Sequence, residues 1–283
     1  MIPFDYITEW RAEAPWTTEA QVEQDLILSR AIVSIFAEPG IARFLAFRGG
    51  TALYKLHLRP AARYSEDIDL AQVSTGPIGD VLDALRRALD PWLGLPRRTA
   101  REGRIALIYR MNSEGQPPVP MRLKVEINSR EHFSVYGTEE REYGVNSRWF
   151  TGNTLVNTYQ LDELLGTKLR ALYQRKKGRD LFDLFIAGRR AKVDPARVVE
   201  CFERYLEHDG KRVTRVEFEI NLREKLADDT FISDVEPLIA LDTAWSLDDA
   251  AGYVQSELLP RLPGDPWRGG ERGPRRGPDD RAR

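Results

Sequence analysis

The chain has 283 residues, of which 42% are hydrophobic and 10% aromatic, so whole-chain disorder is excluded and one large or two smaller packed domains are expected. Its 42 Lys and Arg residues nearly balance 44 Asp and Glu residues, so a nucleic acid would have to be attracted by a local basic patch. The first residues lack the apolar region of a secretory signal peptide. The sequence also has no run of about 18 uncharged apolar residues, the length that a transmembrane helix needs. The lone Cys201 excludes an internal disulfide and a cysteine zinc site. We therefore expect a soluble, cytoplasmic protein without a membrane span.

The first half of the chain mixes helical and strand patterns. Thr17 or Thr18 precedes apolar residues at helical spacing, and Pro39-Gly40 ends the pattern, which predicts a helix over residues 17–38. A loop rich in proline separates the last two strands of this half and excludes regular structure there. The remaining patterns predict strands at 44–47, 65–73, 105–111 and 121–128, and helices at 52–58 and 78–93.

From about residue 157 the pattern becomes helical. The predicted helices are 161–174, 180–187, 194–207, 215–227, 231–240 and 246–260. Residues 263–283 hold five Gly, four Pro and six Arg in 21 positions, a composition that cannot bury a core, so we expect this tail to be disordered. The sequence thus predicts an α+β protein with a mixed α/β lobe over residues 1–150 and a helical lobe over residues 151–262.

The stretch from Phe47 to Leu70 carries most of the chemical information. Gly49 and Gly50 follow a predicted strand and precede a helix, so their amides can approach a phosphate. Asp67 and Asp69 lie two residues apart on the next strand, so both carboxylates point to one face. Two converging carboxylates repel each other unless a divalent cation intervenes, and magnesium is commonly held by one or two carboxylates plus substrate phosphates. The pattern predicts a Mg²⁺ or Mn²⁺ site beside a phosphate cradle.

Each of these features also has a plainer interpretation. A glycine pair alone is more often a turn, and an Asp-x-Asp alone is more often a solvated strand face. Their combination within one β-α-β unit favours function. Thr51 either caps the helix that follows the glycines or binds a phosphate oxygen.

A second group of polar residues lies in the helical half. Three- and four-residue intervals separate Lys168, Leu172, Arg175 and Arg179, which would share a face if one helix continued through residue 178. Eight Lys or Arg residues lie between positions 168 and 190, enough to neutralise a triphosphate or an RNA backbone. From the residues alone, a solvated basic helix face is the favoured interpretation.

The segments FRGGTALYKLHL, RYSEDIDL and TKLRALYQRKKGRDLFDL together resemble the AbiEii/AbiGii-type toxins of type IV toxin–antitoxin systems, which include the MenT group. These toxins fall within the DNA polymerase β-like nucleotidyltransferase superfamily, and the resemblance spans roughly residues 20–190. It implies a nucleotidyltransferase-like mixed sheet followed by a helical domain. It also implies transfer of a nucleoside monophosphate from an NTP to the 3′ acceptor end of tRNA, which blocks aminoacylation and translation, and a cognate antitoxin as partner.

The resemblance also implies roles for single residues. Asp67 and Asp69 would be catalytic and bind the metal, with Glu126 as a third ligand or general base unless it is an ordinary polar strand residue. Lys168 would contact the triphosphate, and Asp183 would orient Lys168 or the acceptor. Asp180 either takes part or caps the following helix. The implied nucleotide-binding residues are Gly49, Gly50, Thr51, Ser65 and Lys168.

Two further functions remain open at this point. A small-molecule nucleotidyltransferase of the antibiotic-modifying type would need an acid-lined acceptor site, whereas a basic cleft favours RNA. A non-catalytic RNA-binding module is disfavoured by the paired acids, because carboxylates repel phosphates unless a metal intervenes. One basic cluster either touches a tRNA backbone or is a solvated loop, and it consists of Arg97, Arg98, Arg101 and Arg104.

Overall fold

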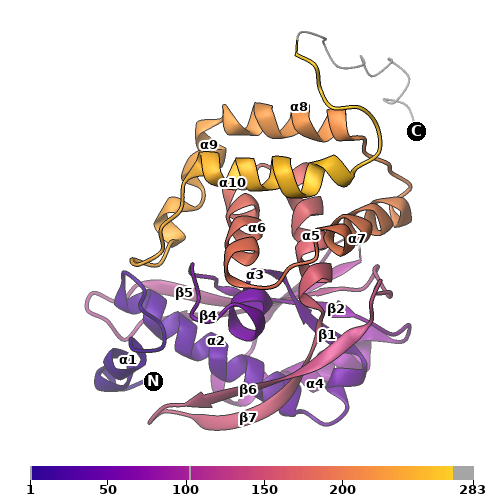
Figure 1. Cartoon of the computed structure of the whole chain (residues 1–283). Coiled ribbons are helices and arrows are strands. Elements are labelled where there is room, and N and C mark those ends of the chain that lie inside the picture. Colours follow the sequence, from indigo (N-terminus) through magenta and orange to yellow (C-terminus); the bar gives the residue numbers. More distant parts are fainter. Residues whose placement is uncertain (1, 102, 270–283) are drawn as a thin grey trace. The chain divides into compact units, whose positions relative to one another are not determined.

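The structure is a computed structural model that describes residues 2–101 and 103–269. It divides into two units, and each is described by itself. The first comprises Met1–Leu164 and Leu238–Ala244, and the second comprises Leu165–Pro237 and Trp245–Arg283. The first unit contains a mixed sheet with helices and the second is helical, so the predicted α+β class is confirmed (Figure 1).

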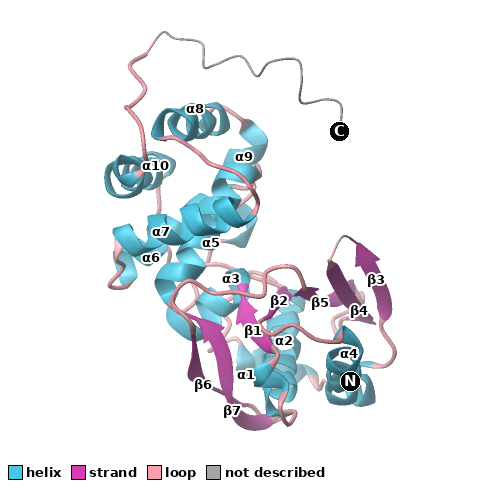
Figure 2. Ribbon diagram, turned by 90° about the vertical axis from the view of Figure 1, so that its right-hand side faces the viewer, coloured by secondary structure: helices cyan, strands magenta, loops and turns pink. Residues whose placement is uncertain are grey.

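The first unit is built on a seven-stranded sheet with the order β3-β4-β5-β2-β1-β7-β6 (Figure 2). β1 runs parallel to β7 and β2 runs parallel to β5, while the other neighbouring strands are antiparallel. The strands are β1 (Leu45–Arg48), β2 (Asp67–Gln72), β3 (Arg97–Arg101), β4 (Arg104–Asn112), β5 (Pro120–Asn128), β6 (Thr138–Asn146) and β7 (Thr151–Tyr159).

Helices α2 and α4 pack on one face of this sheet (Figure 1). Thr18 begins α2 with a capping box in which Thr18 and Gln21 satisfy each other's backbone amides. The buried side of the sheet presents Phe47, Ile68 and Val125 to these helices. The helical segments of the first unit are α1 (Phe4–Trp10), α2 (Glu19–Ala37), η1 (Ile41–Arg43), α3 (Gly49–Ala52), the π-helical η2 (Leu53–His57) and α4 (Ile78–Leu93).

Within its described residues, the second unit contains helices and connecting loops but no strand. The unit boundary falls within α5, and the buried side chains include Leu172, Phe182, Phe202 and Phe218. Its segments are α5 (Leu161–Gln174), α6 (Gly178–Arg190), α7 (Pro195–His208), α8 (Arg215–Leu226), α9 (Asp229–Ser233), η3 (Glu236–Leu238), α10 (Leu247–Tyr253), η4 (Val254–Leu258) and η5 (Leu259–Arg261). Of the helices in the described ranges, none combines the length and the apolar character that a membrane crossing requires.

Three strands and one helix of the first unit were not predicted from the sequence: β3, β6, β7 and α1.

The first unit extends beyond residue 150, where the sequence placed the end of the α/β lobe, because it also contains β7 and the start of α5. Residues 238–244, expected to be partly helical, return to the first unit instead, where the amide of Tyr64 donates to the carbonyl of Leu238. The amide of Ala240 likewise donates to the carbonyl of Ala62.

The predicted disordered tail has contacts over its first residues. The amide of Trp267 donates to the Glu219 carboxylate at 2.6 Å, and the Arg223 guanidinium lies 3.9 Å from the centre of the Trp267 ring. Residues 263–269 thus lie against α8, which differs from the predicted disorder. The rest of the tail, 270–283, lies outside the described residues.

Candidate active site

The glycine pair forms the turn between β1 and α3. Gly49 has a φ of 81°, a region that disfavours any other residue. A β-carbon on Gly49 would overlap the carboxylate of Asp69, and one on Gly50 would overlap the guanidinium of Arg63. Gly49 therefore lets the turn approach β2 this closely, and Gly50 leaves room for the Arg63 side chain.

Hydrogen bonds of Thr51 connect α3 to Ser65 and to the first residue of β2. Thr51 is buried, and its Oγ1 lies 2.5 Å from the carbonyl oxygen of Asp67 and 2.7 Å from Ser65 Oγ. Because the single hydroxyl proton of Thr51 goes to the carbonyl, the Ser65 hydroxyl donates to Thr51. The N-cap of α3 is Arg48, so the capping role considered for Thr51 is wrong. Phosphate binding by Thr51 and Ser65 stays a prediction.

Asp67 and Asp69 point to the same face of the sheet, as their spacing predicts. They alternate with the buried Ile68, and the register sets them beside Lys124 and Glu126 of β5, respectively. On the other side of β2, Asp69 lies directly opposite Arg48, the last residue of β1 before the glycine turn. The two carboxylates thus lie at the end of the sheet where the glycine turn leaves β1.

The electrostatics of Asp67 favour a bound cation. Burial and the neighbouring charge of Asp69 raise the pKa of Asp67 to about 6, although Lys124 and Arg122 oppose this shift. Oδ1 of Asp67 is buried and has no hydrogen-bond partner among the described residues. A buried carboxylate oxygen without a partner is unfavourable, and a divalent cation would satisfy it. Asp67 and Asp69 therefore fit Mg²⁺ or Mn²⁺, which take oxygen ligands.

Glu126 is engaged with cations on its own face of the sheet. Its Oε2 lies 2.5 Å from Lys124 Nζ, and its Oε1 lies 3.6 Å from a guanidinium nitrogen of Arg104. Burial lowers the pKa of Lys124, but the hydrogen bond to Glu126 and the nearby carboxylates outweigh it, and the net shift is upward. Over the described part of the chain, no three Asp, Glu, His or Cys side chains gather to hold a metal ion. The role of Glu126 as a third ligand or general base stays a prediction.

Two cationic residues beside the turn were not singled out from the sequence. Arg48 Nη1 lies 2.7 Å from Oε2 of Glu131 in a largely buried ion pair. Arg63 is buried against Gly50, with its guanidinium 5.3 Å from the Tyr54 ring centre. Arg63 belongs to the RYSEDIDL segment and so could have been noticed, whereas Glu131 carries no signal in the sequence.

The second unit contains a buried ionic cluster at the predicted second block. Lys168 Nζ lies 2.8 Å from Oδ2 of Asp183 and 3.4 Å from Oδ1 of Asp180, and both carboxylates are fully buried. Arg175 Nε lies 2.7 Å from the other oxygen of Asp180. Asp183 is thus placed to orient Lys168, while contact of Lys168 with a triphosphate stays a prediction.

Two expectations for this block are corrected. Helix α5 ends at Gln174, so Lys168, Arg175 and Arg179 do not share one helical face. The N-cap of α6 is Lys177, so Asp180 does not cap this helix but accepts from Arg175 and Lys168.

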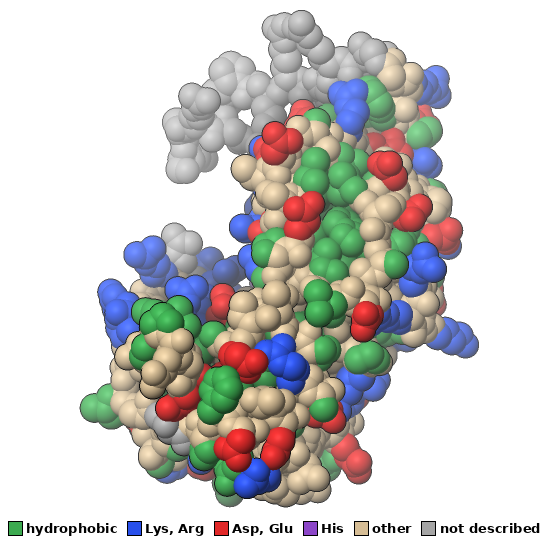
Figure 3. All heavy atoms as spheres, turned by 90° about the vertical axis from the view of Figure 1, so that its left-hand side faces the viewer, with side chains coloured by type: hydrophobic (Ala, Val, Ile, Leu, Met, Phe, Trp, Pro, Cys, Tyr) green, Lys and Arg blue, Asp and Glu red, His purple; other side chains and the backbone are tan. Residues whose placement is uncertain are grey.

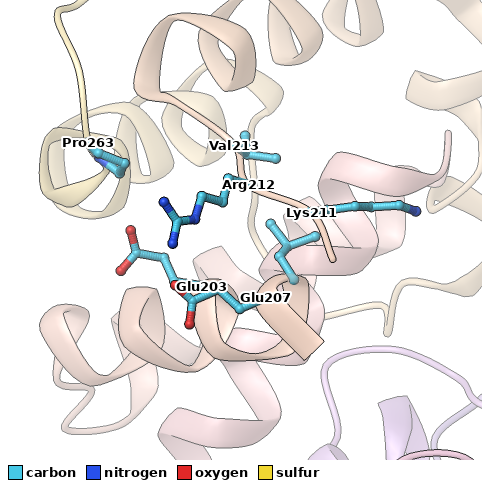
Figure 4. A pocket seen from close by; sticks show the side chains of 7 residues that line it. Glu203, Glu207, Lys211, Arg212, Val213 and Pro263 are labelled. Carbon is cyan, nitrogen blue, oxygen red and sulfur yellow. The ribbon is translucent and has the colours of Figure 1, made fainter. Parts of the chain in front are cut away.

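A pocket of about 300 Å³ also lies in the second unit, between α7 and the segment before α8. Figure 4 shows Arg212 extending toward Glu203 there. None of the residues predicted to act on a nucleotide lines this pocket, so it is separate from the carboxylate pair. Its lining consists of Glu203, Leu206, Glu207, Lys211, Arg212, Val213 and Pro263.

Comparisons with known proteins bear on the fold and on the family. MenT4, a nucleotidyltransferase toxin from Mycobacterium tuberculosis H37Rv, has a similar fold, with a TM-score of 0.62 and 17% identity over 93% of this chain and 91% of that chain. A putative nucleotidyltransferase from H. pylori aligns with a TM-score of 0.49 and 20% identity over 84% of this chain and 92% of its own. No curated protein matches the sequence.

The family model described as "Nucleotidyl transferase AbiEii toxin, Type IV TA system" matches residues 30–252, well over half of the chain. The match includes the glycine turn, the carboxylate pair and the ionic cluster of the second unit. The chain therefore belongs to the AbiEii family of nucleotidyltransferase toxins of type IV toxin–antitoxin systems.

Proposed function

We propose that this toxin is a metal-dependent nucleotidyltransferase that moves a nucleoside monophosphate from an NTP to the 3′ acceptor end of tRNA. The modified tRNA can then no longer be aminoacylated, and translation stops. The observation that carries the proposal is the pair of carboxylates, Asp67 and Asp69, on one face of β2 beside the Gly49–Gly50 turn. A cognate antitoxin, expected for a type IV system, is its protein partner.

The reaction is a displacement at phosphorus. The 3′ hydroxyl of the acceptor loses its proton and attacks the α-phosphate, and a new P–O bond forms. The bond between the α-phosphorus and the bridging oxygen breaks, and pyrophosphate leaves with that oxygen. Asp67 and Asp69 would hold Mg²⁺ or Mn²⁺, which would supply positive charge for the phosphates and lower the pKa of the attacking hydroxyl.

The protein's own groups position the triphosphate. The backbone amides of Gly49 and Gly50 donate to its β- and γ-phosphates, as is common where a glycine turn leads into a helix. Thr51 keeps Asp67 at a fixed distance from this turn through the carbonyl of Asp67. The phosphate-binding turn and the carboxylate-bearing strand β2 are thereby held next to each other.

The test is transfer of label from α-³²P NTPs to purified total tRNA. Asp67→Asn and Asp69→Asn remove one charge each at nearly constant volume, and each is expected to abolish transfer while the melting temperature stays near that of the wild type. Glu66→Gln, an exposed neighbour, is the matched control and should stay active. EDTA should stop the reaction, and Mg²⁺ or Mn²⁺ should restore it.

Two results would contradict the proposal. Retention of more than a few per cent of the activity in both Asp variants would exclude the carboxylate pair as the metal site. Label in small metabolites, with tRNA left unlabelled, would indicate a small-molecule nucleotidyltransferase instead.

A further inference from the structure

The face of the sheet that carries the two carboxylates continues across β5, β4 and β3. Residues directly opposite each other on neighbouring strands point to the same face. The register sets Asp67 beside Lys124, Lys124 beside Ile108, and Ile108 beside Arg97. Arg97, on the edge strand, therefore points to the same side of the sheet as Asp67.

The same register defines a set of basic residues that we call the basic face. Arg101 lies opposite Arg104, and Arg110 lies opposite Arg122. Alternation along β4 and β5 gives all of them the orientation of Lys124. The basic face consists of Arg97, Arg101, Arg104, Arg110, Arg122 and Lys124.

The register places one end of this face beside the carboxylates. Lys124 lies directly opposite Asp67 on the neighbouring strand. Figure 3 shows Lys and Arg side chains gathered at the β3–β4 edge of the first unit. The basic face therefore begins at the carboxylate pair and extends to the edge of the sheet.

Much of this positive charge lacks an internal partner. Glu126 pairs with Lys124 and Arg104. Arg97, Arg101 and Arg110 are exposed and form no ion pair with the residues that the structure describes. Like charges on adjacent strands repel one another, and a polyanion laid across them would relieve that repulsion.

We propose that the basic face binds the phosphates of the RNA strand whose 3′ end reaches Asp67 and Asp69; this rests on the transfer reaction proposed above. From β2 to β3 there are three strand spacings of about 4.8 Å, or about 14 Å in all, which matches about four stacked nucleotides at about 3.4 Å each. The contacts are to phosphates, so binding does not depend on the base sequence.

The chain offers a closely matched control for this proposal. Arg98 is also exposed and also on β3, but it lies opposite Leu107 and therefore points to the other face. Arg97→Ala and Arg98→Ala remove the same charge from adjacent positions of one strand. Arg97→Ala/Arg101→Ala removes both β3 contributions to the basic face.

Binding is measured by fluorescence anisotropy with 5′-fluorescein-labelled tRNA transcripts, and transfer is measured with the same RNA unlabelled. For Arg97→Ala/Arg101→Ala, we expect Kd and KM for tRNA to rise about tenfold or more, with KM for the NTP within twofold of the wild type. The slope of log Kd against log salt should fall by about 0.7 for each lost contact with single-stranded RNA. Arg98→Ala should match the wild type in Kd, in both KM values and in the salt slope.

The outcomes separate this proposal from the proposed reaction. If the wild type labels tRNA but Arg97→Ala/Arg101→Ala behaves like Arg98→Ala, the basic face is overturned and the reaction stands. If the wild type binds tRNA through these arginines but transfers no label to it, the reaction fails and the basic face stands. If the wild type does not bind tRNA, both are overturned.

Discussion

Oγ1 of Thr51 lies 2.5 Å from the carbonyl oxygen of Asp67, so a side chain of the helix that follows the glycine turn fixes the first residue of the carboxylate-bearing strand. Ser65 Oγ completes this link at 2.7 Å. The hydroxyl of Thr51 is thus a positioning group that acts on Asp67 through the backbone.

Thr51→Val should test this link. The substitution keeps the volume but leaves a carbonyl and a hydroxyl without a partner, so the free energy of unfolding should fall by about 1–3 kcal/mol. Activity should fall as well, because the start of β2 is no longer held. Thr51→Ser retains the hydroxyl and should restore most of both. Urea unfolding and nucleotidyl transfer are measured on both variants. Equal stability and activity of Thr51→Val and Thr51→Ser would contradict the positioning role of the hydroxyl.

Gly49→Ala should inactivate the protein. The new methyl group would overlap the carboxylate of Asp69, and the φ of 81° is costly for alanine. We expect at least a hundredfold loss of transfer with a lower melting temperature. Gly79→Ala is the control, since nothing lies near its missing β-carbon and the first turn of α4 tolerates alanine. Wild-type activity in Gly49→Ala would show that the close approach is dispensable.

Lys168→Ala should destabilise the second unit. It leaves two fully buried carboxylates, Asp180 and Asp183, with one cation fewer. Breaking a buried ion pair from one side costs about 3–5 kcal/mol in free energy of unfolding. Lys176→Ala removes an exposed lysine that pairs with Asp228, and it should leave the melting temperature nearly unchanged. Thermal unfolding distinguishes the two, and equal effects would refute a structural role for Lys168.

Glu23→Gln should change how stability depends on pH. Burial raises the pKa of Glu23 to about 7, against an ordinary value of 4.5. The folded chain therefore holds this proton between about pH 4.5 and 7 while the unfolded chain has released it, so the free energy of unfolding falls as pH rises through this range.

Glutamine cannot ionise, and its carbonyl can still accept from the amide of Glu114, which lies 2.9 Å from Glu23 Oε2. Urea unfolding should thus show Glu23→Gln more stable than the wild type at pH 8, by as much as about 3 kcal/mol, and no more stable at pH 4. A difference independent of pH would show that another group is responsible.

The elements that sequence reasoning located well are those with a full apolar stripe or strict alternation. α4 and α5 begin and end at the predicted residues, because each buries one continuous helical face. The common face of Asp67 and Asp69 follows directly from the period of a strand.

The missed strands lack that signal for a physical reason. β7 joins β1 only near its end, where Phe47 lies opposite Thr158. Its first residues pair with β6 alone and are largely exposed, so polar residues suffice there. β3 is an edge strand with exposed arginines on both faces, so its sequence shows no alternation of apolar and polar residues and resembles a solvated loop.

Local sequence patterns do not predict contacts between segments that lie far apart in the chain. The packing of Arg63 against Gly50 and the pairing of Arg48 with Glu131 depend on how strands and loops meet. In the ionic cluster of the second unit, the turn after α5 brings Arg175 back to Asp180, whereas a continuous helix was assumed.

The return of residues 238–244 to the first unit affects how this toxin is made. Their backbone pairs with Ala62 and Tyr64, immediately before Ser65 and Asp67. A ribosome must therefore synthesise most of the helical unit before the segment that leads into the carboxylate-bearing strand can acquire its last backbone partners. The nascent chain would remain incomplete as an enzyme until late in translation, and no single cut in the sequence would release the first unit intact.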